Sequence, residues 1–195
     1  MRTLSLSLSP DFSPQLLGRV QAILWSLPPL EGRPISVAIQ PDLIAHRGKL
    51  LSGDGSRGTP VHAASFIRQR RIVFESSLLG QEQALEFILV HEIFHFVWAR
   101  LSNSLRRQYG ALLVDERRRR ARGELGESSE SRKALLPSDA PFWPEACRDY
   151  ICESFCDTAA WVYTGVHHGS SLLRPLWRER RRNWFADTLR KGCSC

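Results

Sequence analysis

The chain has 195 residues, of which 43% are hydrophobic, and carries a formal net charge of +7. This length and composition suit one globular domain, or one domain of two lobes, with a real core. No run approaches the roughly 18 apolar residues of a membrane span, so we expect no membrane partner. The cysteine count of five is odd and has no framework spacing, which favours reduced thiols and a cytoplasmic protein.

The first forty residues have the pattern of a strand, a helix and a second strand. Residues 1–9 alternate apolar and polar side chains, which is typical of a strand rather than of a secretory signal. Residues 13–27 have helical spacing, with Ser13 as N-cap and Pro14 at the first helical position. Ile35–Gln40 is rich in β-formers. This order predicts a βαβ crossover and a parallel strand pair.

A hairpin is predicted next. Residues 46–60 contain four glycines and a proline, and we predict a flexible loop there. Residues 61–67 and 71–76 then have the pattern of two strands joined by a tight connection, which indicates an antiparallel hairpin.

The most informative stretch is His91-Glu92-Ile93-Phe94-His95, in a helix predicted between residues 83 and 101. Two histidines four apart on a helix differ by about 40° in direction and about 6 Å along the axis, so both can bind one ion. A catalytic zinc site needs a third protein ligand and an open position for water, from which Glu92 is placed to accept a proton. The helix is apolar nearly all round, which predicts burial. A metal would satisfy its buried polar groups.

A pair of acidic residues further along the chain offers a candidate for the missing ligand. Glu153 and Asp157 are four apart in a largely apolar helical segment, and two carboxylates on one face repel each other unless a positive charge lies opposite. We therefore assign Glu153 as the third zinc ligand and Asp157 as the acceptor for the free N–H of a ligating histidine. The alternatives are a solvated helix face for this pair and a chance HExxH string for the first motif.

An HExxH helix followed by ExxxD resembles the gluzincin metallopeptidases, the thermolysin-like clan of zincins, and more loosely the compact bacterial ImmA/IrrE-like metallopeptidases. The likeness covers residues 1–102 by element order and 147–161 by motif. It implies zinc bound by His91, His95 and Glu153, with Glu92 as general base and Asp157 bonded to His91.

The fold implied is a single α+β, zincin-like domain over residues 1–195. Residues 1–102 would form an upper lobe with a small mixed sheet, a backing helix and the HExxH helix, and residues 146–195 a mainly helical lower lobe. In this family substrate peptide pairs with an exposed edge strand, by β-augmentation. Residues 62–66 are our candidate for that edge, with an ordinary solvated strand as the alternative.

Residues 103–145 depart from the compact family pattern. We predict a helix over 104–121 and a short helix near 131–136, in a segment otherwise rich in Gly, Ser, Glu and Pro. The segment could form a partly mobile flap at the cleft or a partner-docking segment.

Three residues after the glutamate helix are candidates for stabilising the oxyanion: Tyr163, His167 and His168. Each of them taken alone is more often an ordinary packing or surface residue. A thiolate from Cys193 or Cys195 could cap the metal, although free cysteines are the simpler interpretation.

The hypothesis from these patterns is a zinc-dependent peptidase that acts on a peptide or protein substrate through metal-activated water. The arginine clusters at 117–120 and 178–182 support a rival, a basic nucleic-acid-binding protein, although no nucleic-acid module is recognised. A third hypothesis is a zincin-fold protein that binds without catalysis.

Overall fold

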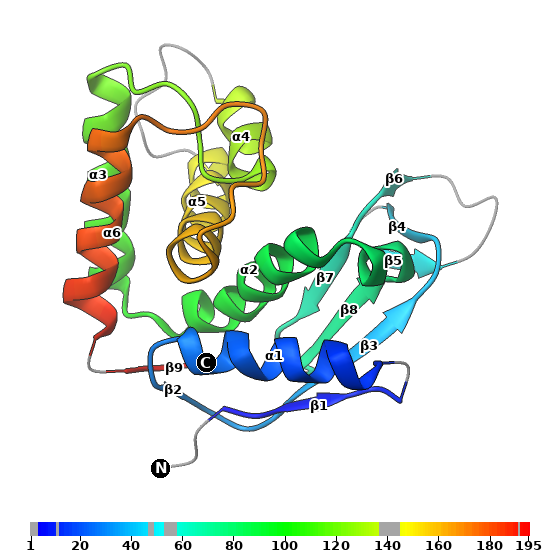
Figure 1. Ribbon diagram of the computed structural model, residues 1–195. Helices are drawn as coiled ribbons and strands as arrows, with labels where there is room; N and C mark the ends of the chain where they lie inside the picture. The colour runs from blue at the N-terminus through cyan, green and yellow to red at the C-terminus, as the bar shows by residue number, and fades with distance from the viewer. Residues whose placement is uncertain (1–3, 11, 47–48, 53–57, 137–144, 191) are drawn as a thin grey trace.

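A computed structural model describes residues 4–10, 12–46, 49–52, 58–136, 145–190 and 192–195. The protein is a mixed α+β structure with small sheets in its first half and mainly helices in its second (Figure 1). The helices are α1 (Pro14–Ser26), η1 (Ser76–Gly80, 3-10), α2 (Glu82–Arg100), α3 (Asn103–Arg118), α4 (Glu127–Ala134), α5 (Glu145–Thr164) and α6 (Pro175–Leu189). The strands are β1 (Leu6–Leu8), β2 (Leu30–Glu31), β3 (Ile35–Gln40), β4 (Leu43–His46), β5 (Lys49–Ser52), β6 (Thr59–Pro60), β7 (Ala63–Phe66), β8 (Arg71–Glu75) and β9 (Cys193–Ser194).

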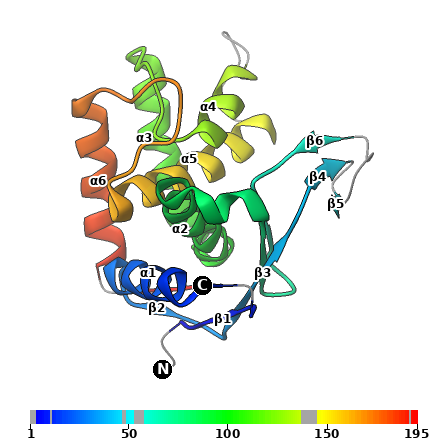
Figure 2. The same ribbon diagram turned by 45° about the vertical axis from the view of Figure 1, so that its right-hand side comes forward.

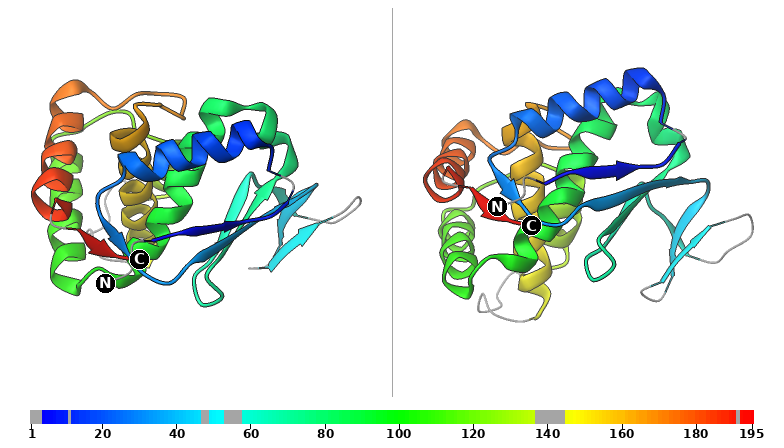
Figure 3. Two further views of the ribbon diagram at one scale, coloured as in Figure 1. Left: turned by 60° about the horizontal axis from the view of Figure 1, so that its bottom comes forward. Right: turned by 90° about the horizontal axis from the view of Figure 1, so that it is seen from below.

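The largest sheet has the strand order β1-β3-β8-β7. β1 and β3 are parallel and α1 connects them, which confirms the predicted crossover. Ser13 caps α1 by accepting a hydrogen bond from the Leu16 amide at 3.3 Å, and Pro14 is the first helical residue. α1 and α2 lie on the same face of this sheet (Figure 3).

β7 and β8 form the predicted antiparallel hairpin, in which Ala63 lies opposite Phe74. Among the described strands β7 pairs with β8 alone, so it is an edge of the sheet, as predicted. The loop prediction for residues 46–60 is wrong in part, because β5 and β6 pair with β4 in a separate three-stranded sheet. Leu50 and Leu51 there find main-chain partners in a neighbouring strand despite the nearby glycines.

α2 runs between the sheet and the helical second half of the molecule (Figures 1 and 2). It is buried on nearly all sides, as its apolar sequence predicts, and packs most extensively on α5. An aromatic cluster fills the space between α2, α3, α5 and α6, and its members are Phe94, Tyr109, Phe155, Tyr163, Trp184 and Phe185.

A buried ionic network holds the helices of the second half together. Arg181 of α6 is fully buried and donates to Glu116 at 2.6 Å and to Glu124 at 2.9 Å. It also donates to the Ser154 hydroxyl of α5 at 3.0 Å. The network therefore fixes α5, the helix on which Glu153 lies.

The segment between the two motifs contains both expected helices. α3 spans Asn103–Arg118, against 104–121 predicted, and α4 spans Glu127–Ala134, four residues earlier than predicted at its start. Residues 137–144 of the predicted flap lie outside the described residues.

The last residues pack against the first half of the chain. β9 pairs in parallel with β2, and the buried Cys195 contacts Gly32 and Arg70. None of the described helices is long and apolar enough to cross a membrane.

Candidate metal centre

The two histidines of α2 and the glutamate of α5 converge on one point. His91 Nε2 lies 3.1 Å from His95 Nε2 and 3.2 Å from Glu153 Oε2, and His95 Nε2 lies 3.7 Å from the same oxygen. Ligands bound to a tetrahedral zinc at about 2.0–2.1 Å are separated from one another by about 3.3 Å. The three residues identified from the sequence therefore fit a zinc ion in both chemistry and spacing.

Asp157 orients the first histidine. Its Oδ1 lies 2.7 Å from His91 Nδ1, so that Nδ1–H donates to the carboxylate and the Nε2 lone pair faces the other donors. Its Oδ2 accepts a 2.7 Å hydrogen bond from the amide of Ser129 in α4. The structure thus places Asp157 behind His91, as the sequence predicts.

The charges around this point favour a cation. Burial disfavours the charged form of His91, but the Asp157 and Glu153 carboxylates outweigh it and raise the pKa of His91 well above its usual value. Burial also opposes ionisation of Glu153, yet His91 and His95 lower the pKa of that carboxyl. The site therefore stabilises positive charge between its donors, which a divalent metal would supply.

Glu92 is held by a residue that the sequence did not single out. Ser65 of β7 lies with its Oγ 2.5 Å from Glu92 Oε2 and 3.1 Å from the Glu92 carbonyl oxygen. This contact ties the proposed base to the edge strand. A lone serine in a short strand carries no signal of such a role.

Gly126 is a second position that the sequence did not indicate. It is the N-cap of α4, and a Cβ there would come within 2.6 Å of Asp157 Oδ2. Only glycine leaves room for this carboxylate to approach the first turn of α4. α4 thus contributes to the site through its backbone.

The donors open into a cavity of about 650 Å³. Its walls come from residues 59–65 and from α2, α4 and α5, with α4 in the part of the chain predicted as a flap. They include His91, Glu92, His95, Glu153, Asp157 and His168.

The three oxyanion candidates lie in different places. His168 borders this cavity and stacks on Phe87 at 5.5 Å. Tyr163 lies within α5, not after it as predicted, and packs against Phe94 in the aromatic cluster. His167 borders a separate cavity with Glu130. Of the three, only His168 shares a cavity with the candidate metal ligands, and its role there stays a prediction.

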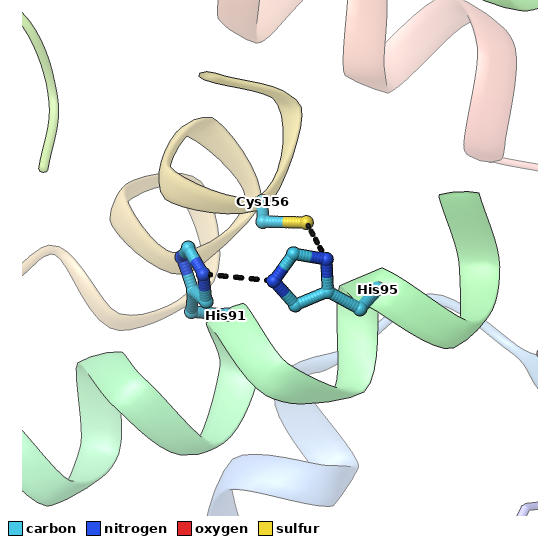
Figure 4. Close-up of side chains that lie close together, drawn as sticks. All are labelled: His91, His95 and Cys156. Atoms are coloured by element: carbon cyan, nitrogen blue, oxygen red, sulfur yellow. Dashed lines mark hydrogen bonds between the residues drawn. The ribbon is translucent and has the colours of Figure 1, made fainter. Parts of the chain in front are cut away.

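Two thiols lie behind the second histidine. Cys152 Sγ and Cys156 Sγ are 3.6 Å and 3.5 Å from His95 Nδ1, and Figure 4 shows Cys156 reaching from α5 to that nitrogen.

His91, His95 and Cys156 also form a possible ligand group, with donor atoms within 4.8 Å of one another. In the group with Glu153 the donor atoms lie closer together, and both histidines contribute Nε2. Burial also raises the pKa of the Cys156 thiol well above its usual value. We therefore favour Glu153 as the ligand and assign Cys156 to the Nδ1 side of His95. No contact joins Cys193 or Cys195 to the site among the described residues.

Comparison of the chain with protein-family models, curated proteins and solved structures finds no match.

Proposed function

We propose that this protein is a zinc-dependent peptidase of the gluzincin type. The observation that carries the proposal is the convergence of His91 Nε2, His95 Nε2 and Glu153 Oε2 within 3.7 Å, with Glu92 in the same cavity. The α+β architecture, with a four-stranded mixed sheet beside the HExxH helix, agrees with a zincin-like fold.

His91, His95 and Glu153 would hold the ion, which as a Lewis acid lowers the pKa of water and polarises a carbonyl. Glu92 accepts the proton of the attacking water and then donates it to the leaving amine. Ser65 keeps the Glu92 carboxylate in place through the 2.5 Å contact. The amide of Ser129 does the same for Asp157, so that both acidic groups are fixed before substrate binds.

The edge strand offers a binding mode for an extended peptide. Residues 59–65 line the cavity, and β7 has no second strand partner among the described residues. Main-chain groups on such an edge can pair with a peptide of any sequence. This agrees with residues 62–66 as the substrate-binding edge.

The contacts of the arginine clusters weigh against the nucleic-acid hypothesis. Arg180 lies 2.5 Å from Asp115, which also pairs with Arg119, and Arg182 pairs with Glu179. Because Arg181 is also fully buried, much of the positive charge of residues 178–182 is paired within the helical half. A structural role thus accounts for a large part of the second cluster.

The test compares zinc content and turnover in four proteins: wild type, Glu153→Ala, Glu92→Gln and Glu127→Ala. Glu127 is a matched control because it lines the same cavity and, among the described residues, pairs with His168 at 3.9 Å and with none of the three candidate ligands. We expect about one zinc per chain in wild type, Glu92→Gln and Glu127→Ala, and loss of zinc in Glu153→Ala.

Hydrolysis of a peptide library should be abolished in Glu92→Gln and retained in Glu127→Ala. Zinc that persists in Glu153→Ala would remove the gluzincin assignment. A zinc-loaded wild type without turnover would leave the non-catalytic binding protein as the better hypothesis.

A further inference from the structure

α4 presents a polar face to the cavity that holds the candidate metal ligands. Ser128, Ser131 and Arg132 are spaced so that they lie on one side of the helix, and all three line the cavity. They face the same space as β7, along which we propose the peptide to lie. This face is therefore placed to contact a bound substrate.

The hydrogen-bonding capacity of this face is largely unused. Neither the Ser128 nor the Ser131 hydroxyl has a hydrogen-bond partner among the described residues. The Arg132 guanidinium makes one ion pair within the described part of the chain, to Asp149 at 4.0 Å, between side chains that are 49% and 64% exposed. The adjacent Lys133 is by contrast fully engaged, with Glu124 at 2.8 Å and a main-chain carbonyl at 3.0 Å.

Arg132 is also the only lysine or arginine among the described residues of this cavity. A guanidinium binds a carboxylate through two parallel hydrogen bonds, and neighbouring hydroxyls can donate to the remaining lone pairs. The three side chains together match the requirements of one carboxylate.

We propose that Ser128, Ser131 and Arg132 bind a carboxylate of the peptide substrate, so that the enzyme selects peptides with an acidic group near the bond that it cleaves. The inference rests on the proposed function. The carboxylate has two possible sources, the free C-terminus of a short peptide and an Asp or Glu side chain.

The test uses random hexapeptides synthesised twice, with a C-terminal acid and with a C-terminal amide, and follows cleavage sites by mass spectrometry. The enzymes are wild type, Arg132→Gln and Arg148→Gln. Arg148 is exposed on α5 and does not line the cavity, so its variant controls for the loss of one positive charge.

If the C-terminus is the source, wild type should cleave the acid library about 10- to 100-fold faster than the amide library. If a side chain is the source, Asp or Glu should be enriched at one position in both libraries. In either case Arg132→Gln should lose the preference and Arg148→Gln should keep it. Equal cleavage of both libraries without enrichment, or a preference that survives in Arg132→Gln, would overturn the inference while the peptidase function stands.

If wild type cleaves neither library, the proposed function fails and binding decides the inference. Two zinc-loaded proteins, Glu92→Gln and the double variant Glu92→Gln/Arg132→Gln, would then be immobilised. The library peptides that each one retains would be identified. Retention of acidic peptides that requires Arg132 supports the carboxylate site. Retention without acidic enrichment, or no retention, refutes it.

Discussion

Replacing Gly126 by alanine should weaken metal binding without touching a metal ligand. The backbone at Gly126 is extended, with φ of −156°, and alanine adopts such a conformation freely. The obstacle is steric, because the new Cβ would lie within 2.6 Å of Asp157 Oδ2 and closer still to the other carboxylate atoms. Asp157 and the first turn of α4 must therefore move apart.

The expected loss follows from what that carboxylate does. It accepts 2.7 Å contacts from both the Ser129 amide and His91 Nδ1, and both contacts lengthen when the carboxylate shifts. Loss of the group that orients a ligating histidine typically lowers metal affinity about 10- to 100-fold. This corresponds to about 1.4–2.7 kcal/mol of binding free energy.

The assay is zinc affinity by competition with a chromophoric chelator, with folding checked by circular dichroism. Gly18→Ala in α1 is the control, because a Cβ there meets nothing within 4 Å. It should leave zinc affinity unchanged and stabilise the helix by up to about 1 kcal/mol. Asp157→Asn should reproduce the loss without any steric change. If folded Gly126→Ala bound zinc within about twofold of wild type, Asp157 would not be the group that orients His91.

Three further predictions concern the contacts that hold the site. Ser65→Ala should keep zinc but lower kcat about tenfold, since it removes the 2.5 Å contact to Glu92; an unchanged kcat would contradict this. Arg181→Met should cost about 3–5 kcal/mol in urea unfolding, because it leaves Glu116 buried without its cation and Glu124 with Lys133 as its remaining one. Burial opposes ionisation of Glu124, yet Arg181 and Lys133 lower its pKa to about 2, below the 4.5 that is usual for a glutamate. Ionised Glu124 should contribute on the order of 3 kcal/mol to the free energy of unfolding above pH 4.5, and this contribution should be lost as the pH falls toward 2. Glu124→Gln should lose less stability over the same pH range.

The sequence predicts the parts of the site that follow from helix geometry. His91 and His95 share a face of α2, and Glu153 and Asp157 share a face of α5, because four residues make about one helical turn. Both helices are apolar enough to be buried, so their few polar residues had to face one another. How α2 and α5 pack against each other could not be predicted from the sequence and is known from the structure.

Two kinds of contribution carry no signal in the sequence. The Ser129 amide acts through the main chain, which every residue except proline shares, and Gly126 acts by lacking a side chain. The strands in residues 49–52 and 59–60 depend on pairing with β4, a non-local contact. The glycines near these residues favoured a loop in the prediction. The strands form nevertheless, because strand preference depends strongly on the strands available for pairing.

α4 contributes to the site in two separate ways, through its backbone and through its side chains. The first turn of this short helix holds Asp157 through the Ser129 amide, whereas Arg132 and its neighbouring serines face the cavity. A change that shifts the whole helix must therefore disturb both the orientation of His91 and the position of the proposed carboxylate site. A change confined to the Arg132 side chain disturbs only the second. Metal affinity and substrate preference should thus vary together in Gly126→Ala and separately in Arg132→Gln, since only the first variant moves the helix backbone.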